Sequence, residues 1–284
     1  MSVRGIAGAL AAALDRACLH LDRRLQRRTR CLRLVPDLAH RRGGKLAYGE
    51  WCWAIGLFQG LLHAHLPRGA PPRLLDVGCG TGLLAVACEP LLGDAGRYLG
   101  IDVSRRDVEY CPAHYPAPRF AFQLLEVRNA AYAPERAAER VPWDVADASV
   151  DLVTALSVWT HLAEPDALFY LREAGRVLRP GGRAILTCFL LDADARAAPA
   201  RAPGGESRYH ATDPARWVFS VPARGSRDWL QPAWAREPED AIAFGEAGLA
   251  RMLAGAGLRE VARHPGTWRE APGLYFQDVL VLER

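Results

Sequence analysis

Short apolar runs, each followed by a stretch with apolar residues at helical spacing, recur along the middle of the chain. The runs predict strands over residues 74–77, 97–102, 119–126, 150–156 and 184–191. The stretches between them predict helices over residues 83–92, 104–110 and 164–178. Because strands that alternate with helices form parallel sheets covered on both faces, the pattern predicts an α/β fold with a doubly wound sheet.

The pattern changes at both ends of this region. Residues 1–45 and 46–66 have helical spacing, and residues 128–148 form a polar stretch typical of an insertion. After the fifth strand, residues 192–240 are rich in Pro, Arg, Ala and Trp with little periodicity, so we expect a second insertion there. A helix over 243–256 and strands over 258–264 and 275–282 follow. The predicted organisation is an N-terminal helical arm or lid, 1–66, and a main α/β domain, 67–284, with an insertion at 192–240.

The positive charge of the chain is concentrated in its first residues. The 284 residues have a formal net charge of +4, yet residues 1–45 hold eleven Arg or Lys against three Asp. The remainder is therefore slightly acidic, which disfavours a nucleic-acid enzyme with a basic active cleft. The arginines are a nucleic-acid arm or, as we favour, the solvated face of a helix. In the second case five leucines pack inward: Leu19, Leu21, Leu25, Leu32 and Leu34.

The cysteines and the hydropathy indicate the compartment. Seven cysteines without a Cys-x-x-Cys pair favour reduced thiols in the cytoplasm and argue against a zinc site. No apolar stretch reaches the ~20 residues that span a bilayer. We therefore expect a cytoplasmic protein with no metal and no membrane contact.

A glycine-rich loop follows the first predicted strand. In residues 74–82, Leu-Leu-Asp-Val-Gly-Cys-Gly-Thr-Gly, three glycines at alternate positions allow a sharp turn and close approach to a ligand. The loop precedes a helix, whose first amides favour negatively charged or polar groups. The third glycine comes one residue too early for a dinucleotide fingerprint, and no Lys-Ser/Thr follows as in a triphosphate loop. Cys79 fits better as a small loop residue than as a nucleophile.

A second strand ends in an acid about twenty residues later, within Gly-Ile-Asp-Val-Ser at 100–104. An acid at this position of an open α/β sheet binds ribose hydroxyls. Together with Asp-Val-Gly-Cys-Gly-Thr-Gly, this segment resembles motif I and the following acidic strand of class I S-adenosylmethionine-dependent methyltransferases. The resemblance spans roughly residues 46–284 and is most specific over 74–190. It implies a Rossmann-like sheet of seven strands, the last antiparallel, and S-adenosylmethionine (SAM) as the methyl donor, with S-adenosylhomocysteine as product.

The resemblance also implies roles for the donor-site residues. Asp76 orders the loop around the methionine amino group, while Asp102 binds the ribose and Val103 flanks the adenine. Glu126 and Val127 lie where the family places an adenine contact, although Glu126 can also be an exposed strand-end carboxylate. The remaining donor contacts implied are Gly78, Cys79, Gly80, Gly82 and Ser157.

Candidates for the acceptor side come from two aromatic-rich segments and from the residues after the fourth strand. His161 and His210 are the candidate bases, because histidine accepts a proton near neutral pH. Aromatic side chains typically line pockets for flat organic molecules, although each can equally pack in the core. The predicted substrate contacts are Tyr48, Trp51, Trp159, Tyr209 and Trp217.

These observations predict a SAM-dependent methyltransferase that modifies an oxygen or nitrogen of a small molecule, in the manner of secondary-metabolite tailoring enzymes. An RNA or other macromolecule methyltransferase is the first alternative, and a non-catalytic SAM-binding scaffold is the second. Nucleic acid and membrane are not expected as partners, and the pattern leaves the oligomeric state open.

Overall fold

A computed structural model describes residues 3–67, 69–129, 135–136, 139–197 and 204–284. Parts of both predicted insertions, 130–134, 137–138 and 198–203, lie outside the described residues. The chain divides into two compact units, Met1–Leu124 and Leu125–Arg284, which are described separately below.

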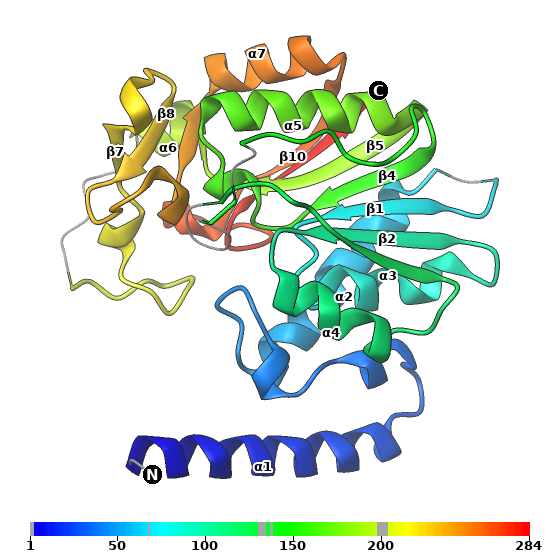
Figure 1. Ribbon diagram of the computed structural model, residues 1–284. Helices are drawn as coiled ribbons and strands as arrows, with labels where there is room; N and C mark the ends of the chain where they lie inside the picture. The colour runs from blue at the N-terminus through cyan, green and yellow to red at the C-terminus, as the bar shows by residue number, and fades with distance from the viewer. Residues whose placement is uncertain (1–2, 68, 130–134, 137–138, 198–203) are drawn as a thin grey trace. The chain divides into compact units, whose positions relative to one another are not determined.

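The first unit contains three parallel strands and four long helices (Figure 1). Helix α2 packs on α3, where the Gln59 amide donates to the Ala87 carbonyl at 3.1 Å. Helix α4 packs on β2 and β3. In chain order the elements are α1 (Val3–Leu25), η1 (Cys31–Leu34), η2 (Leu38–His40), α2 (Tyr48–His65), β1 (Arg73–Val77), α3 (Leu83–Leu92), β2 (Arg97–Asp102), α4 (Arg105–His114) and β3 (Phe120–Leu124).

The second unit combines the remaining strands of the large sheet with a smaller sheet. Helices α5 and α7 lie side by side along these strands (Figure 1). Its elements are β4 (Val150–Ala155), η3 (Trp159–His161), α5 (Glu164–Val177), β5 (Leu178–Cys188), β6 (Leu190–Leu191), α6 (Ala193–Ala197), η4 (Pro214–Trp217), β7 (Phe219–Pro222), η5 (Ala223–Gly225), β8 (Trp229–Pro232), η6 (Pro238–Asp240), β9 (Ala243–Gly245), α7 (Glu246–Ala256), β10 (Arg259–His264), η7 (Thr267–Arg269) and β11 (Asp278–Glu283).

Local sequence explains the ends of the helices. Pro165 occupies the first turn of α5, where its missing N–H costs no hydrogen bond, and Glu164 and Asp166 favour the positive end of the helix dipole. Helix α7 ends at Gly257, which has φ +64° and donates its N–H to the Leu253 carbonyl. Helix α3 starts directly after Gly82 with φ +90°.

The predicted fold class is confirmed. The seven strands of the main sheet follow the order β10-β11-β5-β4-β1-β2-β3. The pairs β1–β2, β2–β3 and β4–β5 are parallel, whereas β11 is antiparallel to both β5 and β10. The final strand is therefore the antiparallel one, as the resemblance implies.

The insertion after the fifth strand contains structure that the sequence pattern does not show. Strands β6, β9, β8 and β7 form a second, four-stranded sheet over an apolar cluster that includes Phe189, Phe219 and Trp268. Each of these strands is at most four residues long, which is too short for a period-2 pattern to stand out. Residues 243–245, predicted as the start of a helix, form β9 instead.

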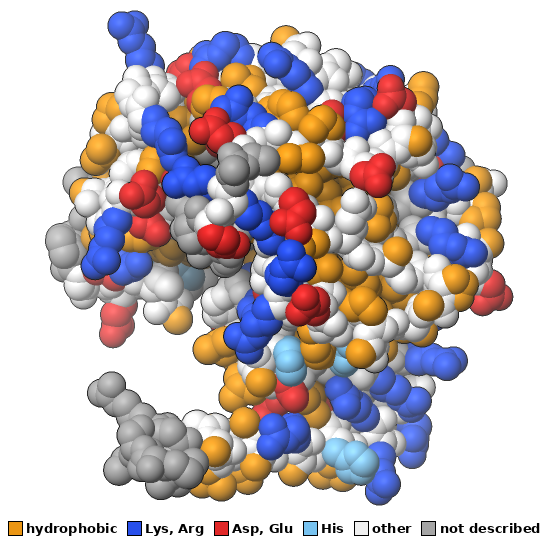
Figure 2. Space-filling view, viewed as in Figure 1, with side chains coloured by type: hydrophobic (Ala, Val, Ile, Leu, Met, Phe, Trp, Pro, Cys, Tyr) orange, Lys and Arg blue, Asp and Glu red, His pale blue; other side chains and the backbone are white. Residues whose placement is uncertain are grey.

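The N-terminal arm is helical as predicted, but its leucines are not all buried. Leu19 is buried, whereas Leu21 and Leu25 are 60% and 64% exposed, so their predicted inward packing is wrong. The cause is that α1 presents only part of its surface to the rest of its unit. Figure 2 shows Lys and Arg side chains gathered at its lower right, over the segment that Figure 1 draws after α1. Within the described residues, no helix combines the length and apolarity needed to cross a membrane.

Candidate functional site

The glycine loop is shaped by backbone conformations that favour glycine. Gly78, Gly80 and Gly82 all have positive φ, at 68°, 51° and 90°. The N–H groups of Gly78 and Cys79 both donate to the Ile101 carbonyl, which ties the loop to the end of β2. A methyl group placed on Gly80 would meet no other heavy atom within 4 Å, so the loop has open space at this glycine.

Asp102 lies beside that open space at the end of β2. Its two carboxylate oxygens accept backbone N–H groups, Oδ2 from Gly80 at 2.7 Å and Oδ1 from Ser104 at 2.8 Å. Burial raises the pKa of Asp102 above its usual value, and the two backbone donors limit that rise. Each oxygen accepts one of these donors and keeps capacity for a further one, as a ribose hydroxyl would provide.

Two buried contacts stabilise the loop from behind. The Tyr98 hydroxyl donates to Asp76 at 2.6 Å, and both residues are buried. The Thr81 hydroxyl donates to the His40 carbonyl at 2.6 Å, so the segment after α1 is fastened to the loop. His40 in turn stacks on Tyr110 of α4, with ring centroids 4.1 Å apart.

Cys79 and Gly82 pack inside the protein. Burial raises the pKa of the Cys79 thiol well above its usual value, which agrees with a packing role. A methyl group on Gly100 would come within 2.8 Å of Cys79 Sγ, so the thiol fills space that this glycine leaves. A methyl group on Gly82 would lie 2.5 Å from the Tyr115 hydroxyl, so a tyrosine occupies the space beside this glycine.

The residues of the first unit fit an adenosyl donor. The loop is open at Gly80, a carboxylate with remaining acceptor capacity adjoins it, and Val103 is half-buried beside that carboxylate. Asp76, which is already paired with Tyr98, lies too deep to meet a ligand directly, at 1% exposed. A role in ordering the loop therefore suits it better than direct contact.

Glu126 and Val127 belong to the second unit. Val127 is buried, whereas the Glu126 side chain is 58% exposed and forms an ion pair with Arg136 at 3.0 Å. This is the environment of a strand-end carboxylate, the alternative considered for Glu126 above.

Ser157 follows β4 with a backbone conformation that is rare for serine, φ +64°. Its N–H donates to Thr187 Oγ1 at 2.7 Å, Thr187 donates to Gln277 Oε1 at 2.5 Å, and Gln277 Nε2 donates to Ser157 Oγ at 2.7 Å. The ring of three side chains holds Ser157 in this strained conformation. Such strained residues cluster at functional sites, which is consistent with the predicted role of Ser157 as a donor contact.

A hydrogen bond to the backbone defines the tautomer of His161. Its Nδ1 lies 2.7 Å from the Glu239 carbonyl, which can only accept, so Nδ1 carries the proton and Nε2 is the basic nitrogen. Burial lowers the pKa of His161 below its usual value and so favours the neutral form.

The predicted aromatic contacts have different environments. Trp51 and Trp159 are fully buried, and the Trp51 indole donates to the Lys45 carbonyl at 2.9 Å. Tyr48 is half-buried and donates to Asp22 at 2.5 Å. Tyr209 and Trp217 are half-buried in the second insertion.

His210, the second candidate base, lies beside a carboxylate from a distant part of the chain. Its Nε2 lies 2.8 Å from Glu270 Oε1, sixty residues further along the chain. The side chain of His210 is only 7% exposed. The sequence indicates no base dyad, because residues that far apart give no local pattern.

The sequence pattern does not indicate the residues that support the site from other elements, namely Tyr98, Thr81, Tyr115, Thr187, Gln277, Thr212 and Glu270. Thr81 alone had a signal, because it lies within the glycine loop. In the described part of the chain, no group of three His, Cys, Asp or Glu side chains could hold a metal ion.

Comparisons with known proteins agree with this geometry. Residues 75–186 match the family model described as a methyltransferase domain. The chain is 35% identical to 27-O-demethylrifamycin SV methyltransferase of Amycolatopsis mediterranei, over 44% of this chain and 42% of that protein. It is also 35% identical to malonyl-[acyl-carrier protein] O-methyltransferase of Hahella chejuensis, over 43% of this chain and 38% of that protein.

A solved structure extends the likeness in fold to more of the chain. The S-adenosylmethionine-dependent methyltransferase of Mesorhizobium loti has a TM-score of 0.51 at 14% identity, covering 79% of this chain and 96% of that one. The chain spans about two fifths of the length of the two curated relatives that it matches. Fold, glycine loop and matches together show that residues 75–186 of this chain carry a methyltransferase domain, with the fold of S-adenosylmethionine-dependent methyltransferases.

Proposed function

We propose that this protein transfers a methyl group from SAM to an oxygen atom of a small molecule, in secondary-metabolite biosynthesis. The observation that carries the proposal is the Asp102 carboxylate, held by the Gly80 and Ser104 amides beside the open side of the glycine loop. The two curated relatives support it, because both carry out methyl transfer and one is named an O-methyltransferase.

The proposed donor contacts follow the resemblance. Asp102 accepts the ribose hydroxyls, Gly78 and Gly80 allow close approach of the methionine part, and Val103 flanks the adenine. Glu126, Val127 and Ser157 are proposed as further contacts. Asp76, Cys79 and Gly82 shape the loop from its buried side. SAM supplies an activated methyl group with a good leaving group, so the protein mainly orients the reactants and excludes water.

Residues 1–66 are proposed to act as an arm that covers the donor loop. The contact that supports this role is the Thr81 hydrogen bond to the His40 carbonyl, which joins the arm to the loop within the first unit. Arg41, which is buried, binds Asp15 through two contacts of 2.7 and 2.9 Å and so fastens this segment to α1.

The proposal is tested with methyl-labelled SAM and a panel of a catechol, a hydroquinone, a dicarboxylic acid and an aromatic amine. We expect labelled product from an oxygen acceptor, and calorimetry should detect SAM binding but no NADH binding. Label on the amine alone would contradict oxygen transfer. NADH binding in place of SAM would contradict the donor assignment. Salt-dependent RNA binding with methylated RNA would instead favour the macromolecular alternative.

His161→Ala is expected to lower turnover while leaving SAM affinity within about twofold of the wild type. The reason is that His161 is one of the two candidate bases, the other being His210, and a general base contributes ~10²–10⁴-fold to a rate. Steady-state kinetics and calorimetry on the same preparation measure the two quantities. His161→Gln, which can still donate to the Glu239 carbonyl, separates a base from a structural anchor. Wild-type turnover in both variants would make His161 a structural residue.

A further inference from the structure

A hydroxyl, an imidazole and a carboxylate form a continuous chain in the second insertion. Thr212 Oγ1 lies 2.9 Å from His210 Nδ1, and His210 Nε2 lies 2.8 Å from Glu270 Oε1. Both His210 Nε2 and Glu270 Oε1 are buried, and the 2.8 Å contact between them is an ion pair that lacks the geometry of a hydrogen bond. Leaving a buried carboxylate oxygen without a donor is costly, which favours a proton on the facing imidazole nitrogen, Nε2.

The neighbouring donors fix the direction of the chain. The Trp217 indole N–H, which can only donate, lies 2.8 Å from Thr212 Oγ1. The Thr212 N–H also points at His210 Nδ1, at 3.4 Å, so this nitrogen is an acceptor. Thr212 therefore gives its hydroxyl proton to His210 Nδ1, and the neutral imidazole carries its own proton on Nε2, toward Glu270.

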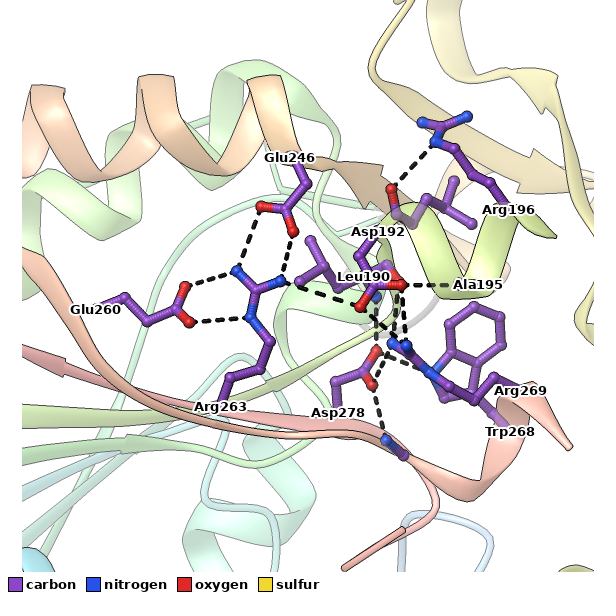
Figure 3. A network of polar contacts seen from close by, with 12 residues as sticks. Leu190, Asp192, Ala195, Arg196, Glu246, Glu260, Arg263, Trp268, Arg269 and Asp278 are labelled. Carbon is purple, nitrogen blue, oxygen red and sulfur yellow. Dashed lines mark hydrogen bonds and ion pairs between the residues drawn. The ribbon is translucent and has the colours of Figure 1, made fainter. Parts of the chain in front are cut away.

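A buried ion network anchors Arg269, the residue before Glu270 (Figure 3). Glu270 has φ +59°, an unfavourable conformation for a residue with a side chain. The preceding residue, Arg269, is anchored by Asp192, with two contacts of 2.9 Å, and by Asp278 at 2.7 Å. The Glu270 N–H donates to the Thr267 carbonyl at 3.0 Å. These contacts fix the backbone that aims Glu270 at His210.

The other end of the chain is open to a ligand. Thr212 is exposed, unlike His210. Its oxygen donates to His210 and accepts from Trp217, which leaves one lone pair for an incoming hydroxyl. Aromatic rings surround the chain, with Phe276 at a centroid distance of 5.1 Å from His210 and 5.0 Å from Trp217. Phe276 directly precedes Gln277, which binds Ser157 at the end of β4.

We propose that Thr212, His210 and Glu270 form the proton relay that activates the hydroxyl of the acceptor, an inference that rests on the proposed function. The acceptor O–H donates to Thr212 Oγ1. As its proton passes to Thr212, the Thr212 proton passes to His210 Nδ1, and the imidazolium is stabilised by Glu270. The acceptor oxygen uses the electron pair that it keeps to form the new C–O bond, while the bond between the methyl carbon and the SAM sulfur breaks. The sulfur takes that electron pair and leaves as S-adenosylhomocysteine, and His210 later releases the proton to water. The relay selects acceptors with an acidic O–H, such as phenols or enols.

The first test measures the protein alone. Long-range proton–nitrogen NMR of ¹⁵N-histidine-labelled protein reports which nitrogen of each of the eight histidines is protonated, and the signal lost in His210→Asn assigns His210. We expect His210 to be protonated on Nε2 and bare on Nδ1. The preference should weaken in Thr212→Val, which removes the hydroxyl donor without changing the side chain's shape. Protonation on Nδ1 in the wild type would overturn the relay.

The second test measures turnover of the best oxygen acceptor from the panel. Thr212→Val, His210→Ala and Glu270→Gln are each expected to lower kcat, by about a hundredfold for His210→Ala at neutral pH. Thr212→Ser, which restores the hydroxyl, should stay within about threefold of the wild type. Added imidazole should recover part of the activity of His210→Ala. His63→Ala on the exposed face of α2 is the matched control. Its kcat should equal that of the wild type, with or without added imidazole.

The outcomes separate the relay from the proposed function. Calorimetry with SAM should give the same affinity in all these variants, because none lies in the glycine loop. Equal loss in Thr212→Ser and Thr212→Val, or no rescue by imidazole, would assign the three residues a structural role and leave the methyl transfer standing. If SAM binds but no acceptor in the panel is methylated, the small-molecule proposal fails, while the NMR result still decides the relay's geometry.

Discussion

Asp278→Ala is expected to lower the free energy of unfolding of the second unit by about 3–5 kcal/mol, the cost of leaving a buried charge without its partner. Asp278 is 0% exposed. Its Oδ1 accepts from the Gly266 N–H and from Arg269, both at 2.7 Å, and its Oδ2 accepts from the Leu190 N–H at 2.8 Å and the Trp268 indole at 2.9 Å. The alanine variant would leave four buried donors without this acceptor (Figure 3).

Urea denaturation followed by circular dichroism measures this loss. Asp147→Ala is the matched control, because it also removes an aspartate from an Arg ion pair, but one in which the aspartate is 75% exposed. Exposed pairs contribute roughly 0–1 kcal/mol. A loss for Asp278→Ala no greater than that of the control would show that the network of Figure 3 does not hold the unit together.

Asp102→Ala is expected to weaken SAM binding by roughly 1–3 kcal/mol, or about fivefold to 150-fold in Kd. The carboxylate would otherwise accept the ribose hydroxyls, and it also fixes the Gly80 and Ser104 amides. The effect should appear in calorimetry as lower affinity, measured on a variant that circular dichroism shows to be folded.

Asp94→Ala is the control for this experiment, since it removes the same charge from an exposed position of the same unit and should leave the affinity unchanged. Asp107→Ala is a second control, because Asp107 accepts from Ser104 Oγ at 3.0 Å at the start of α4. An equal loss of SAM affinity in this variant would assign the effect to the start of α4 and not to the ribose contact. Unchanged SAM affinity in Asp102→Ala would contradict the ribose assignment.

Much of the main sheet could be predicted from the sequence. The helix over 83–92 and the strand over 97–102 have the predicted bounds, because an apolar run between clear turn signals determines both ends. The strand predicted over 184–191 has other bounds in the structure. Strand β5 starts earlier, at Leu178 directly after α5, ends at Cys188 and includes Gly181 with φ +74°. A Pro-Gly-Gly segment is typical of a turn, and here it forms an irregularity in the pairing with β4, between the pairs Val150–Leu178 and Leu152–Arg183.

The acceptor-side groups could not be predicted in the same way. Glu270 lies sixty residues from His210, and Gln277 lies 120 residues from Ser157 in the chain. Neither residue belongs to a motif, and an isolated Glu or Gln is usually a surface residue. Their roles depend on how the loop before β11 packs against the second insertion, which local spacing does not encode.

The sequence by itself determined the glycine loop, the acid at 102, the alternation of strands and helices and the basic character of the first residues. These features are local, since each depends on backbone conformation or burial periodicity within about ten residues. Only the tertiary structure decided which of the two candidate bases, His161 and His210, has a carboxylate partner, which tryptophans are buried and how Ser157 is held in a strained conformation. The physical reason is that a hydrogen bond or an ion pair depends on distances between atoms, and distant segments come within reach only after the chain has folded.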